Sequence, residues 1–442
     1  MRVAIVHDWL VGGGAERVVE ELHKLYPDAP IYTSYCTPEW RKRLDDKVVT
    51  GWLQHFGKVR KFIPVLRIWW FTHLDFSDYD LVISSSGNGE AFGIRVHKQK
   101  GGWLSKLLVA HGASEDRKGG VQNSTLTDMV SFSPASGLSP LHREKATISD
   151  RSSQQSDTSK SGGRAVGFAD SRPSAVREPV HVNYCHAPTH FYWRFYDQYL
   201  NEPGFGIFNP LARIGLKLLT KPLRAWDYEA SQRPDYFIAN STHIQSEIKQ
   251  FYGRESIVIY PPVDIERFSN THTEKRSGFV TASRQVPQKK LDIIIGACNE
   301  LKLPLTVIGR GPEHNKLVAM AGDTIKFRDD VSDEEMPKLL ASAEAFLFAA
   351  YEDFGVTPVE ALATGTPVIA YKKGGALDYV KPGINGDFFE QQTSASLSEA
   401  LQKFDAKRYS ETAIKKSANC FNSDSFRNTF KNYVGNKMKE KI

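Results

Sequence analysis

Two glutamates, Glu352 and Glu360, bracket a short loop that contains a glycine, with seven residues between them. The apolar run at 345–350 is short enough to be a buried strand of a parallel sheet. The loop after it is therefore expected at the carboxyl edge of that sheet, where open α/β folds bind their ligands. A carboxylate at this edge could accept hydrogen bonds from the hydroxyl groups of a sugar or from a ribose diol.

The local sequence offers a second explanation for Glu360. Thr357 predicts a helix N-cap with Pro358 at the first helical position, and Glu360 stands three residues after the cap, as in a capping box. Gly365 is expected to end this helix after about two turns. The structural and the ligand-binding interpretations of Glu360 both remain open, whereas Glu352 has no evident structural task.

Two basic residues follow another predicted strand. Residues 278–282 are typical of a strand, and Arg284 and Lys289 come soon after it. Two cations at a strand-to-helix junction can neutralise the charge that develops on a departing diphosphate. Solvated surface charge is the alternative for Lys289 taken singly.

Glycines separate the first predicted strand, at 3–6, from the helix that follows. Gly13 and Gly14 could let the backbone approach a phosphate and aim helix-start N–H groups at it. The motif lacks the dinucleotide spacing and the ribose-binding acid about twenty residues further on, so a tight turn is the alternative. A dehydrogenase is disfavoured for the same reason.

A histidine ends the predicted strand at 180–185. A lone histidine is more often structural, but His186 lies at the sheet edge where sites form. His190 is a weaker candidate for the same site. Gly374 and Gly375 precede a further expected helix and offer a second phosphate cradle.

The elements that must position these residues alternate between strand and helix, which predicts an α/β fold with doubly wound parallel sheets. A chain of 442 residues that are 40% hydrophobic suits two domains. We expect the boundary near 262, where two prolines stiffen the connection. Residues 112–178 are rich in serine, glycine and charge and lack apolar periodicity, which predicts a disordered insertion.

These motifs together resemble a known family. Glu352-x7-Glu360, the run Gly365-Thr366-Pro367-Val368-Ile369-Ala370 and Gly374-Gly375 are similar to the signature of the group 1 (family 4) retaining glycosyltransferases. The resemblance covers nearly the whole C-terminal half and returns in pieces of the N-terminal half. It implies the GT-B architecture, in which two Rossmann-like domains, here 1–262 and 263–423, face a central cleft. It also implies that a last helix, at 424–442, packs back on the first domain.

The resemblance further implies roles for individual residues. His186 would lie by the donor sugar, and Glu352 would hold sugar hydroxyls beside the backbone of Phe354, Gly355 and Val356. The other implied donor-binding positions are Gly13, Gly14, Arg284, Lys289 and Glu360, with the last on the ribose. The family uses a nucleotide-sugar donor without a metal ion, so no metal ligand and no other cofactor are expected. Two departures are Ser283, where the family has glycine, and the insertion, which has no family counterpart.

Composition restricts the partners. A net charge of +6 suggests an anionic partner without identifying it, and nothing beyond charge favours nucleic acid. Two basic-aromatic stretches, 58–74 and 205–226, favour contact with an anionic membrane or, equally well, packed helices with a solvated basic face. The four cysteines are widely spaced, and no signal peptide or apolar run of about 20 residues is evident, so a cytoplasmic protein is expected, peripheral on the membrane if it meets one.

We therefore expect a retaining, metal-independent hexosyltransferase acting on a glycan or lipid-linked acceptor in cell-envelope polysaccharide synthesis. The chain also resembles the mannosyltransferase branch that builds O-antigen lipopolysaccharide, which suggests mannose from GDP-mannose. An epimerase or hydrolase of sugar nucleotides on the same fold would turn over donor without an acceptor. A nucleotide-sugar-binding protein would bind donor and show no turnover.

Overall fold

The structure, a computed structural model, describes residues 1–55, 64–96, 178–201, 206, 209–273 and 275–441. Residues 1–98 and 177–442 form one compact unit, to which all the described residues belong. The expected insertion at 112–178 lies outside the described residues except for its last position. Residues 58–63 of the first basic-aromatic stretch also lie outside them.

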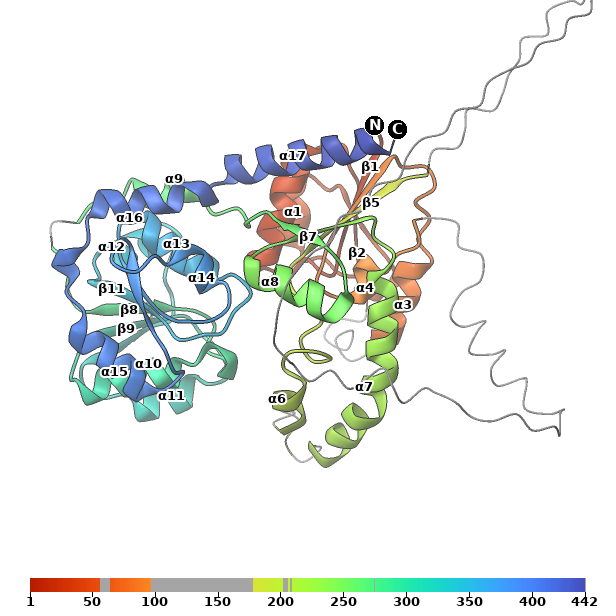
Figure 1. Cartoon of the computed structure of the whole chain (residues 1–442). Coiled ribbons are helices and arrows are strands. Elements are labelled where there is room, and N and C mark those ends of the chain that lie inside the picture. The colour runs from red at the N-terminus through yellow and green to blue at the C-terminus, as the bar shows by residue number, and fades with distance from the viewer. Residues whose placement is uncertain (56–63, 97–177, 202–205, 207–208, 274, 442) are drawn as a thin grey trace, which may run out of the picture. The chain divides into compact units, whose positions relative to one another are not determined.

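A parallel sheet with the strand order β3-β2-β1-β4-β5-β6-β7 forms the N-terminal part (Figure 1). Its strands are β1 (Val3–His7), β2 (Ile31–Thr33), β3 (Val48–Thr50), β4 (Leu81–Ser85), β5 (Val180–Cys185), β6 (Tyr236–Ala239) and β7 (Ser256–Val258). Its helices are α1 (Gly14–Leu25), α2 (Pro38–Arg43), α3 (Pro64–Thr72), α4 (Gly89–Phe92), α6 (Tyr196–Asn201), α7 (Asn209–Ser231) and α8 (Thr242–Glu247).

A second parallel sheet, ordered β10-β9-β8-β11-β12-β13, forms the C-terminal part. Its strands are β8 (Phe279–Ala282), β9 (Leu305–Ile308), β10 (Ile325–Arg328), β11 (Ala345–Phe348), β12 (Val368–Tyr371) and β13 (Gly386–Phe389). The helices in this later part of the chain are α9 (Ile265–Ser269), α10 (Leu291–Glu300), α11 (His314–Met320), α12 (Glu335–Ala341), α13 (Val356–Ala363), α14 (Ala376–Tyr379), α15 (Ser394–Lys403), α16 (Glu411–Ala418) and α17 (Ser423–Glu440).

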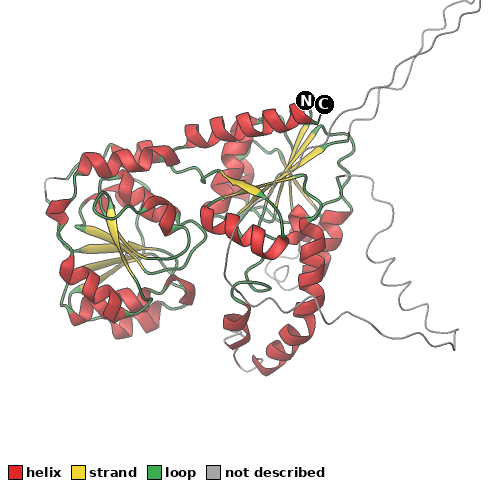
Figure 2. Cartoon of the chain, viewed as in Figure 1, coloured by secondary structure: helices red, strands yellow, loops and turns green. Residues whose placement is uncertain are grey.

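Helices cover both faces of each sheet (Figure 2), which explains why the central strands read as continuous apolar runs. In each sheet the strand order reverses beside a central strand. Strand β1 lies between β2 and β4, and β8 lies between β9 and β11. Ligands of open α/β sheets bind at the carboxyl ends of such strands, so the loops after β1, β4, β8 and β11 are the places to look for a site.

The last helix, α17, packs on the N-terminal sheet rather than on the C-terminal one. Phe426, Phe430 and Val434 are buried in the same apolar cluster as residues of β1 and β5. The ring of Phe426 lies 5.8 Å from that of Tyr184. Figure 1 shows α17 alongside α1, which it contacts.

The predicted start of the helix after β11 was wrong by two residues. Helix α13 begins at Val356 with Gly355 as its N-cap, and no side chain caps it, so Thr357 does not act as the cap. Gly355 has a φ of 89°, in the region that favours glycine, and a Cβ there would meet the ring of Phe348 and the hydroxyl of Tyr379, each at 3.0 Å. This glycine lets the chain turn directly from the strand into the helix.

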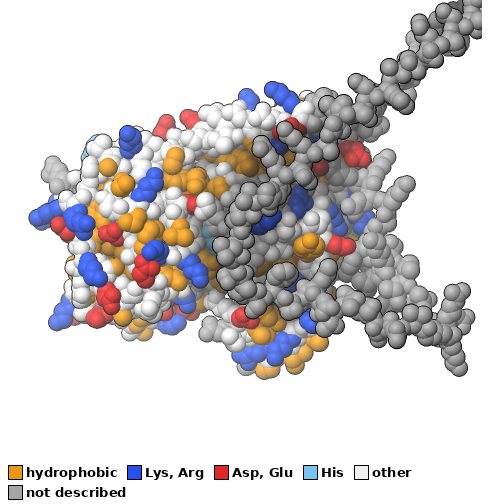
Figure 3. All heavy atoms as spheres, in the orientation of Figure 1, with side chains coloured by type: hydrophobic (Ala, Val, Ile, Leu, Met, Phe, Trp, Pro, Cys, Tyr) orange, Lys and Arg blue, Asp and Glu red, His pale blue; other side chains and the backbone are white. Residues whose placement is uncertain are grey.

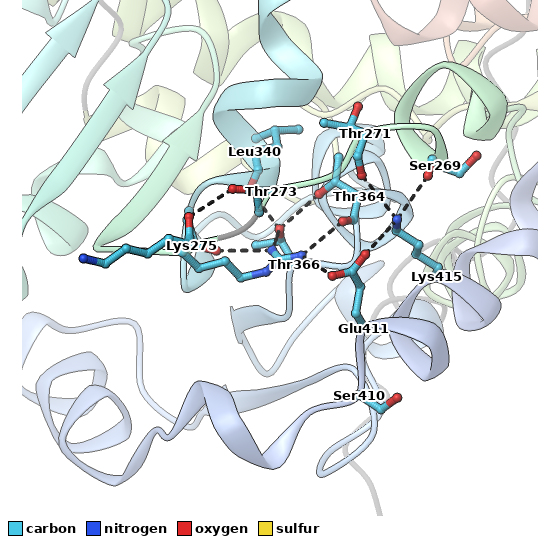
Figure 4. Close-up of polar contacts among 12 residues, drawn as sticks. Ser269, Thr271, Thr273, Lys275, Leu340, Thr364, Thr366, Ser410, Glu411 and Lys415 are labelled. Atoms are coloured by element: carbon cyan, nitrogen blue, oxygen red, sulfur yellow. Dashed lines mark hydrogen bonds and ion pairs between the residues drawn. The ribbon is translucent and has the colours of Figure 1, made fainter.

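A partly buried arginine fixes the far end of α13, and Figure 4 labels the residues that it bonds. Arg276 donates to the hydroxyl of Thr366, to the carbonyl of Thr364 at 3.3 Å and to Glu411 at 3.4 Å. Lys415 bonds Glu411 at 2.9 Å and the carbonyl of Ser269 at 3.1 Å. The turn after α13 is therefore tied to the helices on either side of it.

We expect Arg276→Ala to lower the free energy of unfolding by about 1–3 kcal/mol, because buried acceptors at the end of α13 lose their donor. Urea unfolding monitored by circular dichroism measures this change. Arg408→Ala, at an exposed site, is the matched control. Equal stability of the two variants would mean that this network does not hold the helix.

Candidate functional site

Lys289 and Glu352 meet where the strand order of the C-terminal sheet reverses. Glu352 follows β11, Lys289 ends the 3₁₀ turn after β8, and the two side chains form an ion pair. Each is about a quarter exposed. Burial lowers the pKa of Lys289 to about 8; Asp353 opposes this shift and Arg284 adds to it. The structure thus brings together three of the residues that the sequence predicted for a sugar and a diphosphate.

Asp353, next to Glu352, anchors the loop after β11. It pairs with Arg194, and its carboxylate lies 3.3 Å from Nε2 of His190. Although burial raises the pKa of Asp353, His190 and Arg194 hold it well below its usual range. The guanidinium of Arg194 also stacks 5.0 Å from the ring of Tyr351. His190 therefore positions this loop in the structure, rather than standing free as a second candidate acid or base.

His186 directly follows β5, at the sheet edge where it was predicted, and is held neutral. Its Nε2 lies 2.9 Å from Oγ of Ser85, at the end of the neighbouring strand β4. Burial lowers the pKa of His186 to about 3, and the adjacent His7 adds to that shift. A neutral imidazole can exchange single hydrogen bonds with a substrate but carries no charge to stabilise a leaving group.

Glu360 binds an arginine rather than its own helix. Its Oε1 accepts from Nη1 of Arg17 at 2.6 Å, so the capping-box interpretation was wrong. Gly13, Gly14, Arg17, Val356 and Glu360 line a cavity of about 630 Å³. This cavity brings the glycine loop after β1 and the start of α13 together, which suits a polar, partly anionic ligand.

The glycine loop is organised by an acid that its sequence contains. Glu16 accepts from the N–H groups of Gly12 at 3.0 Å and of Val11 at 3.3 Å. A Cβ at Gly13 would lie 2.9 Å from the same carboxylate. The loop is a formed turn whose position depends on Glu16.

Phe354 contributes its backbone to the site, because its side chain is part of the core. It is 3% exposed and packs 5.5 Å from the ring of Tyr379. Gly375 presses against the same loop: a Cβ there would lie 2.3 Å from Cα of Phe354, and its N–H donates to the carbonyl of Glu352 at 2.9 Å. Since α14 is only four residues long, the Gly374-Gly375 turn supports the loop rather than forming a second helix-start cradle.

Asp8 is a candidate that the sequence interpretation missed. Its Oδ2 accepts from Ser86 at 2.7 Å and Asn88 at 3.2 Å, whereas its buried Oδ1 has no partner among the described residues. It lines a cavity of about 190 Å³ together with His186. Burial raises the pKa of Asp8, and Arg67 and His7 partly offset that shift. Asp8 directly follows β1 as His186 follows β5, but the strand predicted at 3–6 ended one residue too early for the same rule to select Asp8.

Neither a metal site nor a membrane-spanning helix is found among the described residues. Among them, no group of three or more histidine, cysteine, aspartate or glutamate side chains could hold a metal ion. Within the same residues, no helix is long and apolar enough to cross a membrane.

Comparisons with known proteins concern the family and the fold. Residues 262–419 match the family described as Glycosyl transferases group 1. The mannosylfructose-phosphate synthase of Agrobacterium fabrum is 29% identical over 119 residues, 26% of this chain and 26% of that protein. The MMP alpha-(1->4)-mannosyltransferase of Mycolicibacterium hassiacum is 30% identical over 184 residues, 38% of this chain and 44% of that protein. The chain spans a quarter to a half of the length of the curated relatives it matches.

Among solved structures, the complex of Anabaena Alr3699/HepE with UDP is 16% identical, with a TM-score of 0.58 over 99% of this chain and 100% of that one. This likeness concerns the fold, and it confirms the expected GT-B architecture of two parallel-stranded domains. Residues 262–419, which carry the C-terminal sheet, are thus the part of the chain that is similar to group 1 glycosyltransferases.

Proposed function

We propose that the protein is a retaining glycosyltransferase that moves a hexose from a nucleoside-diphosphate sugar to a glycan or lipid-linked acceptor. The observation that carries the proposal is the meeting of Lys289 and Glu352 at the reversal of strand order in the group 1 domain. A cation for a diphosphate and a carboxylate for sugar hydroxyls are the two groups that such a donor needs side by side.

In the donor complex, Lys289 and Arg284 bind the diphosphate, and Glu352 accepts hydrogen bonds from the sugar hydroxyls. The backbone N–H groups at Gly355 and Val356, where α13 begins, face the same ligand. Glu360 accepts from the ribose diol in place of Arg17. Two likenesses support a nucleotide sugar as the donor. HepE has been solved in complex with UDP-glucose, and some relatives are named as mannosyltransferases. The donor we propose is GDP-mannose, from which mannose is transferred.

Transfer occurs on one face of the sugar. The bond between the anomeric carbon and the diphosphate oxygen breaks, the acceptor oxygen forms the new bond on the same face, and the acceptor proton leaves with the diphosphate. Lys289 and Arg284 stabilise the charge on the departing group without a metal ion. Neutral His186 holds a sugar hydroxyl near the reacting carbon, so catalysis comes chiefly from positioning.

Asp8 receives the acceptor. Its free Oδ1 and the cavity that it shares with His186 suit a hydroxyl group of an incoming glycan or lipid-linked sugar. We place this acceptor in cell-envelope polysaccharide synthesis.

We expect Asp8→Asn to lower kcat by about tenfold or more, because an amide is a poorer acceptor for the attacking hydroxyl. The Kd of the donor should stay unchanged, because Asp8 is proposed to bind the acceptor. Steady-state kinetics and calorimetric donor binding measure the two quantities. Asp78→Asn, at a side chain that is 90% exposed, is the control. Weaker donor binding with an unchanged kcat would mean that Asp8 binds the donor rather than the acceptor.

The activity itself is tested with radiolabelled nucleotide sugars and membrane lipid extract, in EDTA. The proposal predicts label in the lipid or glycan fraction and retention of the anomeric configuration by NMR. Donor consumption that is independent of extract would instead indicate an epimerase or hydrolase. Inversion of configuration would contradict the proposed mechanism.

A further inference from the structure

The first four turns of α7 present apolar side chains to solvent. Leu211, Ile214, Leu218 and Leu219 are 69%, 55%, 70% and 57% exposed, and we call these four the apolar stripe. Their spacing of three, four and one residues places them along one side of the helix. Figure 3 shows hydrophobic and basic side chains gathered together over this part of the surface. An exposed stripe of large aliphatic side chains marks an interaction surface.

The second half of α7 holds the stripe in place. Trp226, Asp227 and Ala230 are buried, and the Asp227 carboxylate accepts from Trp193 at 2.7 Å and Tyr252 at 2.9 Å. The last turns of α7 are thus anchored in the core of the N-terminal part of the protein. The stripe is therefore presented by a helix that is anchored at one end, beyond Pro222.

Two lysines border the stripe. Lys217 and Lys221 are exposed and one turn apart, on the side next to Ile214 and Leu218. Residues 209–224 contain no aspartate or glutamate. The cations beside this stripe are therefore not neutralised from within the same segment, and the surface complements an anionic partner.

The two remaining basic residues of this segment have structural tasks. Arg213 donates to the carbonyl of Asn201 at 2.7 Å and thereby caps α6. Arg224 bonds the carbonyl of Tyr192 at 2.5 Å and stacks 5.3 Å from the ring of Trp193. Only Lys217 and Lys221 are thus available to meet a charged surface.

The other basic-aromatic stretch behaves differently. In α3, Arg67, Trp70 and Phe71 are each at most 7% exposed, and Arg67 forms a buried ion pair with Glu90. Most of α3 is thus a packed helix of the N-terminal core. The structure separates two stretches that their composition could not distinguish.

We propose that the first four turns of α7 bind the surface of an anionic lipid bilayer. The apolar stripe enters the boundary between headgroups and acyl chains, and Lys217 and Lys221 meet lipid phosphates. A bilayer is the partner we choose, because an apolar stripe bordered by two exposed lysines, in a segment without acids, complements anionic headgroups above acyl chains. This inference does not depend on the proposed transfer, because its readout is binding.

The test is flotation of the full chain with vesicles of phosphatidylcholine containing 30% phosphatidylglycerol, compared with phosphatidylcholine alone. We expect binding to the anionic vesicles that weakens with salt. Ile214→Asp/Leu218→Asp should lower the bound fraction at least about tenfold. Lys217→Glu/Lys221→Glu should lower the partition coefficient about 25-fold or more, since each lysine contributes about fivefold.

Matched controls lie in the C-terminal part. Val318→Asp, at a position 44% exposed, and Lys326→Glu/Lys403→Glu should float like the wild type. Equal loss in the control and test variants would overturn the proposal, as would a wild type that does not float. Sedimentation in the absence of vesicles tests whether a second copy of the chain covers the stripe instead. If the wild type is a dimer that does not float, and Ile214→Asp/Leu218→Asp makes it a monomer, the stripe serves self-association.

Discussion

Replacing Glu352 with alanine is expected to lower kcat about 100-fold or more, with the fold and the Tm close to those of the wild type. Glu352 holds the sugar in the proposed donor complex, and a charged acceptor that strengthens its hold in the transition state is worth about this much. In the structure its only ion-pair partner among the described residues is Lys289, and it lies outside the apolar clusters. The loop should therefore keep its shape through Asp353 and Gly375.

Steady-state kinetics with a saturating nucleotide sugar measure this effect. Glu399→Ala, at an exposed acid of α15, is the matched control and should retain wild-type turnover. Turnover by Glu352→Ala within a few-fold of the wild type would remove the residue from the catalytic role assigned to it.

Lys289→Ala is expected to lower kcat/KM by about 1,000-fold, because the departing diphosphate loses a cation in a partly buried position. The pH dependence provides a second signature. Lys289 has a pKa of about 8, so it is charged below that pH and loses its proton as the pH rises through it. The kcat/KM of the wild type should therefore fall above about pH 8, because this ratio reports the ionisation of the free enzyme.

Lys289→Arg tests whether Lys289 causes the alkaline limb, the fall in kcat/KM above about pH 8. An arginine stays protonated throughout this range, so the fall above pH 8 should disappear even though the geometry is less favourable. Lys302→Arg, in the turn after α10, is a control that should leave the limb in place. Persistence of the limb in Lys289→Arg would mean that another group, or the substrate, is responsible for it.

The elements around the site were predictable because they depend on local patterns. Buried parallel strands are continuous apolar runs, and the polar residue after each run marks the binding edge of the sheet. This reasoning located Glu352, Lys289 and His186 and the parallel sheets that carry them. The helix start at α13 was missed because the conformation of Gly355, with φ at 89°, outweighed the cap residues that follow it.

Contacts between distant segments could not be predicted from local patterns. Arg17 and Glu360 are 343 residues apart, and Arg194 and Asp353 are 159 apart, yet each pair is bonded. Periodicity shows which face of an element is buried but does not show which charged residue will meet it from another element. The same limit applies to α3 and α7, whose compositions are alike although one is packed and the other exposed.

The central claim, a nucleotide-sugar site on the group 1 domain, is tested most directly by the thermal stability of the full chain. The Tm is measured with GDP, UDP, ADP and their sugars in excess, with and without EDTA. At a ligand concentration of 100 times Kd, binding adds about 2.7 kcal/mol, which corresponds to a rise of several degrees. We expect this rise for one nucleotide family, unchanged by EDTA and lost in Lys289→Ala. No shift with any of these nucleotides, or one that requires a metal ion, would contradict it.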